Sequence, residues 1–355
     1  MHLPPIPRFF ARWTIRAVLF VLFVVLPAGV IYLRQVGVGK ELNARVAAAL
    51  SGKGFRTEIG MLSVDPFKGF VARDVAVWET SGGERNLARI ERLVVSMNLT
   101  DLLAGRITVN HVRLDETDVS VPLGSQPDSP RVDVKGVSAE LFMLNDDLRI
   151  SSLEGQVQGI NVILSGSLRN LRAFHLQHAA TQKVQGPPEI LDRIVETLST
   201  VKFPGAPPEL RLKINGDLAD LTTLRAAPLS FHSGPIITPE WRVDGVEAEA
   251  DYEKQTLDVK RLNVRVGPGT LNLSGQWKDG ALDFELSSSV KPEAFSRLLP
   301  RESPFKELRF SSAPQIVTTG RAVPSPAGIQ YNVTGTIQTG KFSFRGMDFD
   351  SFSTD

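Results

Sequence analysis

Val134-Lys135-Gly136-Val137-Ser138-Ala139-Glu140, followed by Leu164-Ser165-Gly166, is a pattern that this sequence uses twice. The second copy is Val243-Asp244-Gly245-Val246-Glu247-Ala248-Glu249, followed by Leu273-Ser274-Gly275. The two copies are offset by 109 residues (245 − 136). Repeats of extended, alternating segments are typical of architectures that grow by adding units. The repeat therefore indicates a long surface built from strands.

Alternation within each copy predicts strands with one apolar face. In the second copy Leu271 and Leu273 alternate with Asn272 and Ser274, and the next segment continues the pattern. Helices that begin at proline are predicted at matching points of the two copies, over residues 187–199 and 292–299. We therefore expect a mainly β, antiparallel fold with repeat units at 132–235 and 241–328 and the start of a further unit at 329–355.

An apolar run near the N-terminus, Ala17 to Leu33, predicts a membrane anchor within residues 1–35. At roughly 1.5 Å per residue the run reaches about 25 Å, close to the ~30 Å of a bilayer core. Arg8, Arg12 and Arg16 precede it and favour a cytoplasmic N-terminus. A cleaved signal peptide is the alternative, although no Ala-x-Ala site directly follows the run.

Between the anchor and the repeat, residues 36–125 read as one helix followed by strands. Leu42, Val46 and Leu50 fall on one face of a helix that Gly52 and Gly54 end. The predicted elements are a helix over Gly39–Ser51 and strands over Thr57–Val64, Phe70–Trp78, Ala88–Leu99 and Ile107–Leu123.

Composition excludes several classes of function. The chain has 355 residues, a formal net charge of +1 and no cysteine. The near-zero charge does not favour nucleic acid as a partner, and the lack of cysteine excludes disulfides and a thiolate nucleophile.

The search for reactive groups finds no catalytic or metal site, and no cofactor is expected. His175 and His178 are the closest pair of histidines, but their segment reads as extended or loop. Asp146-Asp147 and Asp348–Asp350 look like turns and lack the ligand count of a calcium loop. Gly267-Pro268-Gly269 is a tight turn with no phosphate-binding motif after it. The chain is therefore predicted not to be an enzyme.

A sheet with one apolar face must cover that face. A second sheet would give stacked sandwiches, whereas a curled open sheet would leave the face to acyl chains. The alternation fits both arrangements.

The order of segments after the apolar run is a further clue. A short amphipathic helix leads into Glu-Ile-Gly-Met-Leu-Ser-Val-Asp-Pro-Phe-Lys-Gly (Glu58–Gly69), Ala-Arg-Asp-Val (Ala72–Val75) and Leu-Leu-Ala-Gly-Arg-Ile-Thr-Val (Leu102–Val109). This order resembles the start of AsmA-like proteins, and the ending Gly340–Asp350 resembles their repeated strands. Members of that family usually run longer, so we expect the sequence to be an N-terminal fragment.

The resemblance implies an elongated, curved, repeating β-groove behind a single-pass anchor in the bacterial inner membrane, with the bulk of the chain in the periplasm. It also implies passive phospholipid transport toward the outer membrane, with acyl chains as ligands. A non-enzymatic envelope scaffold or outer-membrane assembly factor that binds proteins through the sheet is the alternative. The residues predicted to form the groove floor are Leu93, Val95, Met97, Leu99, Val109, Leu271, Leu273, Leu282, Phe284 and Leu286.

Overall fold

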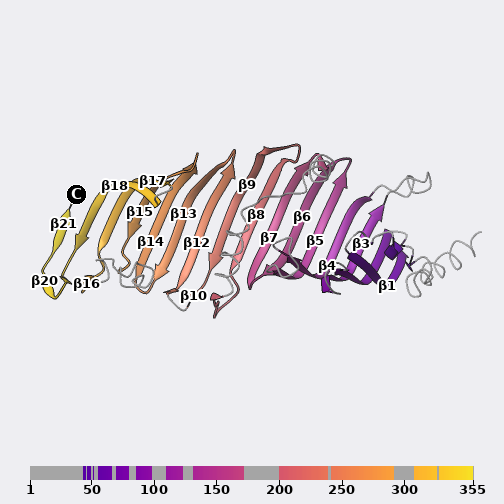
Figure 1. Ribbon diagram of the computed structural model, residues 1–355, viewed down its shortest axis with the longest axis horizontal. Helices are drawn as coiled ribbons and strands as arrows, with labels where there is room; N and C mark the ends of the chain where they lie inside the picture. Colours follow the sequence, from indigo (N-terminus) through magenta and orange to yellow (C-terminus); the bar gives the residue numbers. More distant parts are fainter. Residues whose placement is uncertain are drawn as a thin grey trace, which may run out of the picture. The chain divides into compact units, whose positions relative to one another are not determined.

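The computed structural model contains two units, residues 1–120 and 121–355, and the described residues of each lie almost entirely in strands (Figure 1). The strands carry the sequence-predicted alternation, so the fold is mainly β, as expected. The structure describes residues 43–44, 46–48, 51, 55–65, 69–79, 85–97, 109–122, 131–171, 200–238, 241–291, 308–325 and 328–354.

The four strands of unit 1 are antiparallel and pair in chain order. Each strand lies where the alternation predicted one. Helical residues at 43–44 and 46–48 fall within the predicted helix. The strands are β1 (Phe55–Asp65), β2 (Gly69–Glu79), β3 (Arg85–Met97) and β4 (Val109–Pro122).

The core of unit 1 forms on the face that the helical residues cover. Leu62, Ala72 and Val75 are buried there, and Val46 of the helical segment and Leu93 of β3 pack against them. Removing apolar surface from water stabilises the fold by about 25 cal/mol per Å². One face of unit 1 is therefore partly covered by the chain itself.

Acidic side chains meet across three strands of unit 1. Glu91 of β3 shares a hydrogen bond with Glu116 and lies near Asp74, so its pKa is raised; Glu116, burial and Asp74 all act in this direction. Glu91 binds its proton more tightly in the folded than in the unfolded chain. Its contribution to stability is therefore present below the usual pKa of glutamate and is lost as the pH rises through the raised pKa.

We expect Glu91→Gln to flatten the pH dependence of unfolding on the acidic side of neutrality. The amide keeps a donor toward Glu116 but carries no charge at any pH. Thermal unfolding of the full chain between about pH 4 and pH 7 checks this against Glu140→Gln, a change on a strand of unit 2. Identical pH profiles for Glu91→Gln and the unchanged chain would contradict the assignment.

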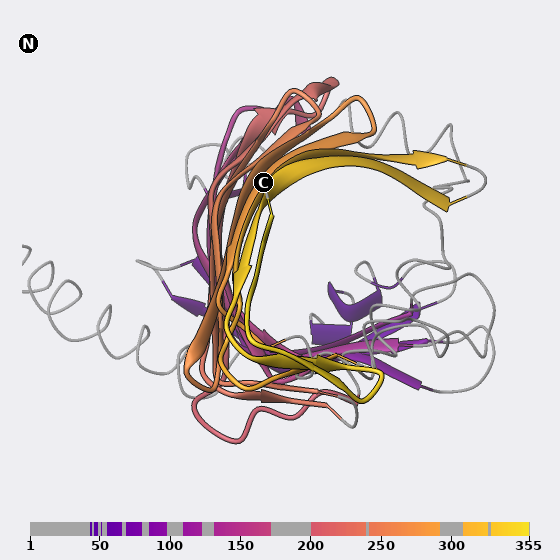
Figure 2. The same cartoon turned by 90° about the vertical axis from the view of Figure 1, so that its left-hand side faces the viewer.

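Unit 2 holds one large sheet and two small ones. In Figure 2 its long strands, orange to yellow, bend along their length into an arc. The order in the large sheet is β5-β6-β7-β8-β9-β12-β13-β14-β15-β17-β18-β21. Its strands are β5 (Arg131–Leu144), β6 (Asp147–Val157), β7 (Ile160–Arg169), β8 (Glu209–Asp217), β9 (Asp220–Ser233), β12 (Gly245–Glu253), β13 (Thr256–Val266), β14 (Gly269–Lys278), β15 (Ala281–Ser288), β17 (Gln315–Ser325), β18 (Gly328–Thr339) and β21 (Phe352–Thr354).

The small sheets lie in connections between these strands. One pairs β10 (Ile236–Ile237) with β11 (Arg242–Val243). The other joins β16 (Leu308–Phe310), β19 (Phe342–Phe344) and β20 (Met347–Phe349), where Phe342 stacks between Phe310 and Phe349 at ring distances of 5.9 and 4.8 Å. Aromatic stacking of this kind adds stability beyond the area buried.

The sequence repeat is a structural repeat. β6 and β7 start and end 109 residues before β13 and β14, and β5 ends 109 residues before β12. In the β5–β6 hairpin Ser151 has no partner in the register, and in the matching β12–β13 hairpin Lys260 has none. In the β6–β7 and β13–β14 hairpins two residues of the earlier strand have no partner at the same place, Ser151-Ser152 and Lys260-Arg261. Such bulges bend a strand and increase its local twist. The two copies therefore share these pairings and irregularities, and the first copy has one more, between Lys135 and Ser138.

Two expectations are corrected. The sheet is not wholly antiparallel, because β8 runs parallel to β7, which a connection of residues 170–208 allows. The segment Asp348–Asp350 is not a turn: Asp348 lies in β20, and the turn is at Arg345-Gly346, where both residues have positive φ. The turns at Asp146 and at Gly267-Pro268 are confirmed.

Several predicted features lie outside the described residues: the anchor Ala17–Leu33, the helices at 187–199 and 292–299, and His175 with His178. No helix in the described part of the chain is long and apolar enough to cross a bilayer. The domain boundaries predicted from the sequence stay predictions.

Candidate functional site

One face of the large sheet of unit 2 carries a continuous apolar surface, which we call the apolar face. Residues that are paired across neighbouring strands point to the same face, so the register identifies its members. A first row crosses from β5 to β18, and only small and apolar residues occur in it. In order, these are Ala139, Leu153, Leu164, Leu212, Leu229, Ala250, Val259, Gly275, Phe284, Gly320 and Val333.

A second row lies beside the first, two residues along each strand except β13, where a bulge makes the separation three. It is apolar from β8 to β15 and ends at Thr318 of β17. Its members are Leu210, Phe231, Ala248, Leu262, Leu273 and Leu286. The described residues contain no second large sheet that could cover these rows.

The ring of Phe284 lies over a glycine of the apolar face. Its ring reaches across to β17, where a Cβ on Gly320 would come within 3.0 Å of the ring tip and of a methyl of Val333. An aromatic side chain that lies over a cross-strand glycine fills the space left by the missing side chain. The phenyl ring therefore fills the gap that Gly320 would leave in the apolar face.

The structure brings together all five groove residues predicted in unit 2. Leu273 pairs with Leu286, Leu271 with Ser288 on the same face, and Phe284 and Leu282 pair with Gly275 and Trp277. All five are half-buried.

The unit 1 predictions are placed differently. Leu93 packs against the buried cluster of unit 1, so the chain itself covers part of it. Val95 and Val109 are half-buried on β3 and β4, Met97 is paired with Val109 in the register, and Leu99 lies outside the described residues.

The sequence reasoning missed the members of the apolar face on β8, β9 and β13. Val259 and Leu262 both belong to it although they are three residues apart, because the bulge inserts an extra residue between them. The signal was present as a broken alternation: Leu-Asp-Val, then Lys260-Arg261, then Leu-Asn-Val. Ser151-Ser152 breaks the first copy at the same point.

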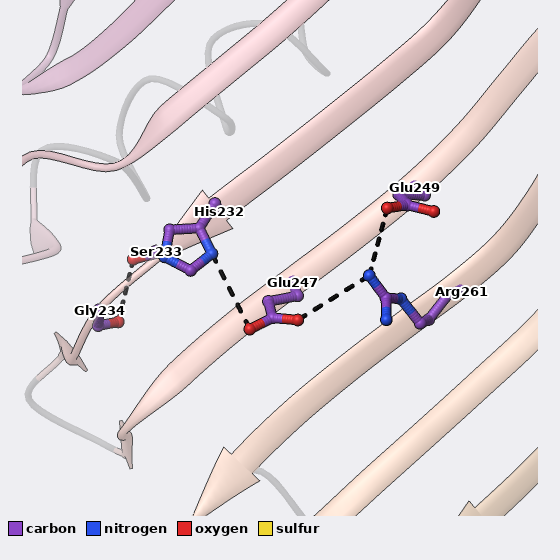
Figure 3. Close-up of polar contacts among 6 residues, drawn as sticks. All are labelled: His232, Ser233, Gly234, Glu247, Glu249 and Arg261. Atoms are coloured by element: carbon purple, nitrogen blue, oxygen red, sulfur yellow. Dashed lines mark hydrogen bonds and ion pairs between the residues drawn. The ribbon is translucent and has the colours of Figure 1, made fainter.

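The opposite face of the same strands is polar and carries ion pairs. His232 of β9 places Nδ1 3.9 Å from Oε1 of Glu247 on β12 (Figure 3). Arg261 of β13 bridges Glu247 at 3.9 Å and Glu249 at 3.2 Å. All four side chains are exposed or nearly so, and exposed pairs of this kind contribute about 0–1 kcal/mol each. This face is a solvated surface.

The described residues offer little for chemistry. None of them form a group of three or more His, Asp or Glu side chains that could hold a metal ion. Lys260 has a raised pKa because Asp251 accepts its hydrogen bond at 2.5 Å, which keeps it charged and unsuited to act as a base. No family model, curated protein or solved structure matches this chain. The apolar face is therefore the candidate functional site.

Proposed function

We propose that this protein is a membrane-anchored lipid conduit of the bacterial envelope, in which phospholipid acyl chains lie on the apolar face of unit 2. The observation that carries the proposal is the uninterrupted apolar row from Ala139 to Val333. Eleven successive strands contribute to it without one charged residue. The predicted anchor at Ala17–Leu33 would tie this surface to the inner membrane.

The physical case rests on the cost of moving acyl chains through water. Each methylene removed from water contributes about 0.8 kcal/mol, so a free lipid tail crosses an aqueous gap very slowly. A floor that is apolar at every strand keeps that energy nearly constant along the sheet. The strands also pair their backbone groups with one another, so few polar groups face the tails.

Photocrosslinking in cells tests the proposal on the full chain. A photoreactive amino acid replaces Leu273 on the apolar face or, as a control, the adjacent Asn272 on the polar face. In cells grown with radioactive phosphate, we expect a phospholipid adduct from position 273 and at least about tenfold less from position 272, because only the former contacts the tails. Equal labelling at the two positions, or none, would reject the conduit.

The same experiment addresses the alternative function. Val317, Val323, Met347, Phe349 and Phe352 are exposed apolar residues near one end of unit 2, as on protein-binding surfaces. If position 273 crosslinks to a protein and never to lipid, the envelope scaffold is the better assignment.

A further inference from the structure

The two long edges of the unit 2 sheet, where its strands are connected, differ in charge. One edge holds the β6–β7, β9–β12, β13–β14 and β15–β17 connections; β10 and β16 lie along it in Figure 1. We call it the basic edge, and its cations are Lys202, Arg242, Arg265, Lys291 and Lys341. The other, the acidic edge, carries Asp146, Asp147, Asp217, Asp220 and Asp279, which outnumber the cations Arg169, Lys254 and Lys278 beside them.

Backbone hydrogen bonds hold the cations of the basic edge in a line. Lys202 exchanges two bonds with Ile237, at 2.8 and 2.9 Å, and Ile237 pairs with Arg242. The amide of Asp244 donates to the carbonyl of Arg265 at 2.7 Å. Lys202, Ile237 and Arg242 are therefore one cross-strand row, with the apolar residue between two cations.

The line continues past the next connection. Nζ of Lys291 donates to the carbonyls of Phe310 and Ser311 at 2.9 and 3.0 Å. The amide of Ser311 donates in turn to the carbonyl of Lys341 at 2.9 Å. The basic edge thus runs from β9 to β18.

Three of these cations keep their charge uncompensated. Arg242 pairs with Asp244 at 3.3 Å and Lys341 with Asp350 at 3.9 Å. Lys202, Arg265 and Lys291 have no carboxylate partner among the described residues. Arg265 follows Val264, so its side chain lies on the polar face at the end of β13, over Gly245. Unpaired cations at the edge of an apolar surface complement an amphiphile with apolar tails and an anionic head.

We propose that the phosphate of a bound phospholipid lies along the basic edge of unit 2 while its acyl chains lie on the apolar face. This inference rests on the proposed function and adds a lipid class and an orientation to it. The acidic edge repels the phosphate, so every lipid on the track points its head group the same way. Uncharged lipids lack this orientation.

The test uses the full chain in a neutral detergent with two photoreactive lipids of identical acyl chains, phosphatidylglycerol and diacylglycerol. One variant combines Lys202→Glu, Arg265→Glu and Lys291→Glu. The matched control combines Arg169→Glu, Lys254→Glu and Lys278→Glu, which changes the net charge equally at the acidic edge. We expect the first variant to lose about tenfold or more of its phosphatidylglycerol labelling, and the control little. Neither should lose diacylglycerol labelling.

Other outcomes separate the two proposals. Equal loss of phosphatidylglycerol in both variants, or no loss in either, would overturn the basic edge and leave the conduit standing. Failure of the unchanged chain to label with either lipid would overturn both. If circular dichroism shows that the Glu variant misfolds, the neutral combination of Lys202→Gln, Arg265→Gln and Lys291→Gln replaces it. We then expect a smaller loss of phosphatidylglycerol labelling, and labelling that depends less on salt than that of the unchanged chain.

Discussion

Leu273→Asp should abolish lipid loading of unit 2. Leu273 lies between Leu262 and Leu286 in the second row of the apolar face. A carboxylate at this position would keep water beneath the acyl chains, or it would lose its own hydration when the chains cover it. The second arrangement costs several kcal/mol, because the charge is then buried without a partner. We expect at least about tenfold less phospholipid bound per chain, measured by mass spectrometry of lipid extracted from the purified full-length protein.

Asn272→Asp is the matched control for this prediction. It introduces the same charge one residue earlier, on the polar face, where the Oδ1 acceptor that Asn263 uses at 2.6 Å is retained. We expect lipid content and folding to be unchanged, since neighbouring strand residues point to opposite faces. If Leu273→Asp retains the lipid content of Asn272→Asp, acyl chains do not lie on this face.

Gly166→Ala should destabilise unit 2 more than any other alanine substitution described here. Gly166 has φ +141°, a region that residues with a side chain rarely adopt, and its Cβ would approach the carbonyl oxygen of Ile214 at 1.7 Å. Relief requires β7 and β8 to separate. Strain of this kind costs of order 1–3 kcal/mol before the clash is counted, so the melting temperature should fall by roughly 10 °C.

Two comparisons separate this clash from a general intolerance of glycine replacement. Gly275, the repeat partner of Gly166, would meet the carbonyl oxygen of Asp283 at 2.4 Å, so Gly275→Ala should also be costly. A Cβ on Gly234 has nothing within 4 Å, and Gly234→Ala should shift the melting temperature by about 1 °C or less. Equal melting temperatures for all three variants would remove the steric explanation.

The sequence predicted the strands well because the relevant physics is local. The apolar and polar alternation of β13, β14 and β15 follows from the two-residue period of a strand, and the turns follow from glycine and proline. The parallel pairing of β7 with β8 was not predictable. It depends on where the long connection after Arg169 returns, and no residue pattern in β8 encodes that direction.

The groove residues were only partly predictable, for a related reason. Alternation identified Leu271, Leu273 and Phe284, whose strands are regular. In β3 the same reasoning selected Leu93, which a helical residue from earlier in the chain covers in part. Alternation says which side chains share a face, but not what covers that face. The basic edge was missed because its cations come from connections scattered between Lys202 and Lys341.

The parallel pair also bears on how the sheet assembles. Most neighbouring strands in the large sheet of unit 2 are joined by a turn of two residues. These parts of the sheet can grow by adding one hairpin after another, at a small entropic cost each time. β8 must instead close a connection of about forty residues, and loop closure grows costlier with length, roughly as (3/2)RT ln n. We therefore expect β5–β7 and the strands from β8 onward to form as separate blocks, with the junction between them closing last.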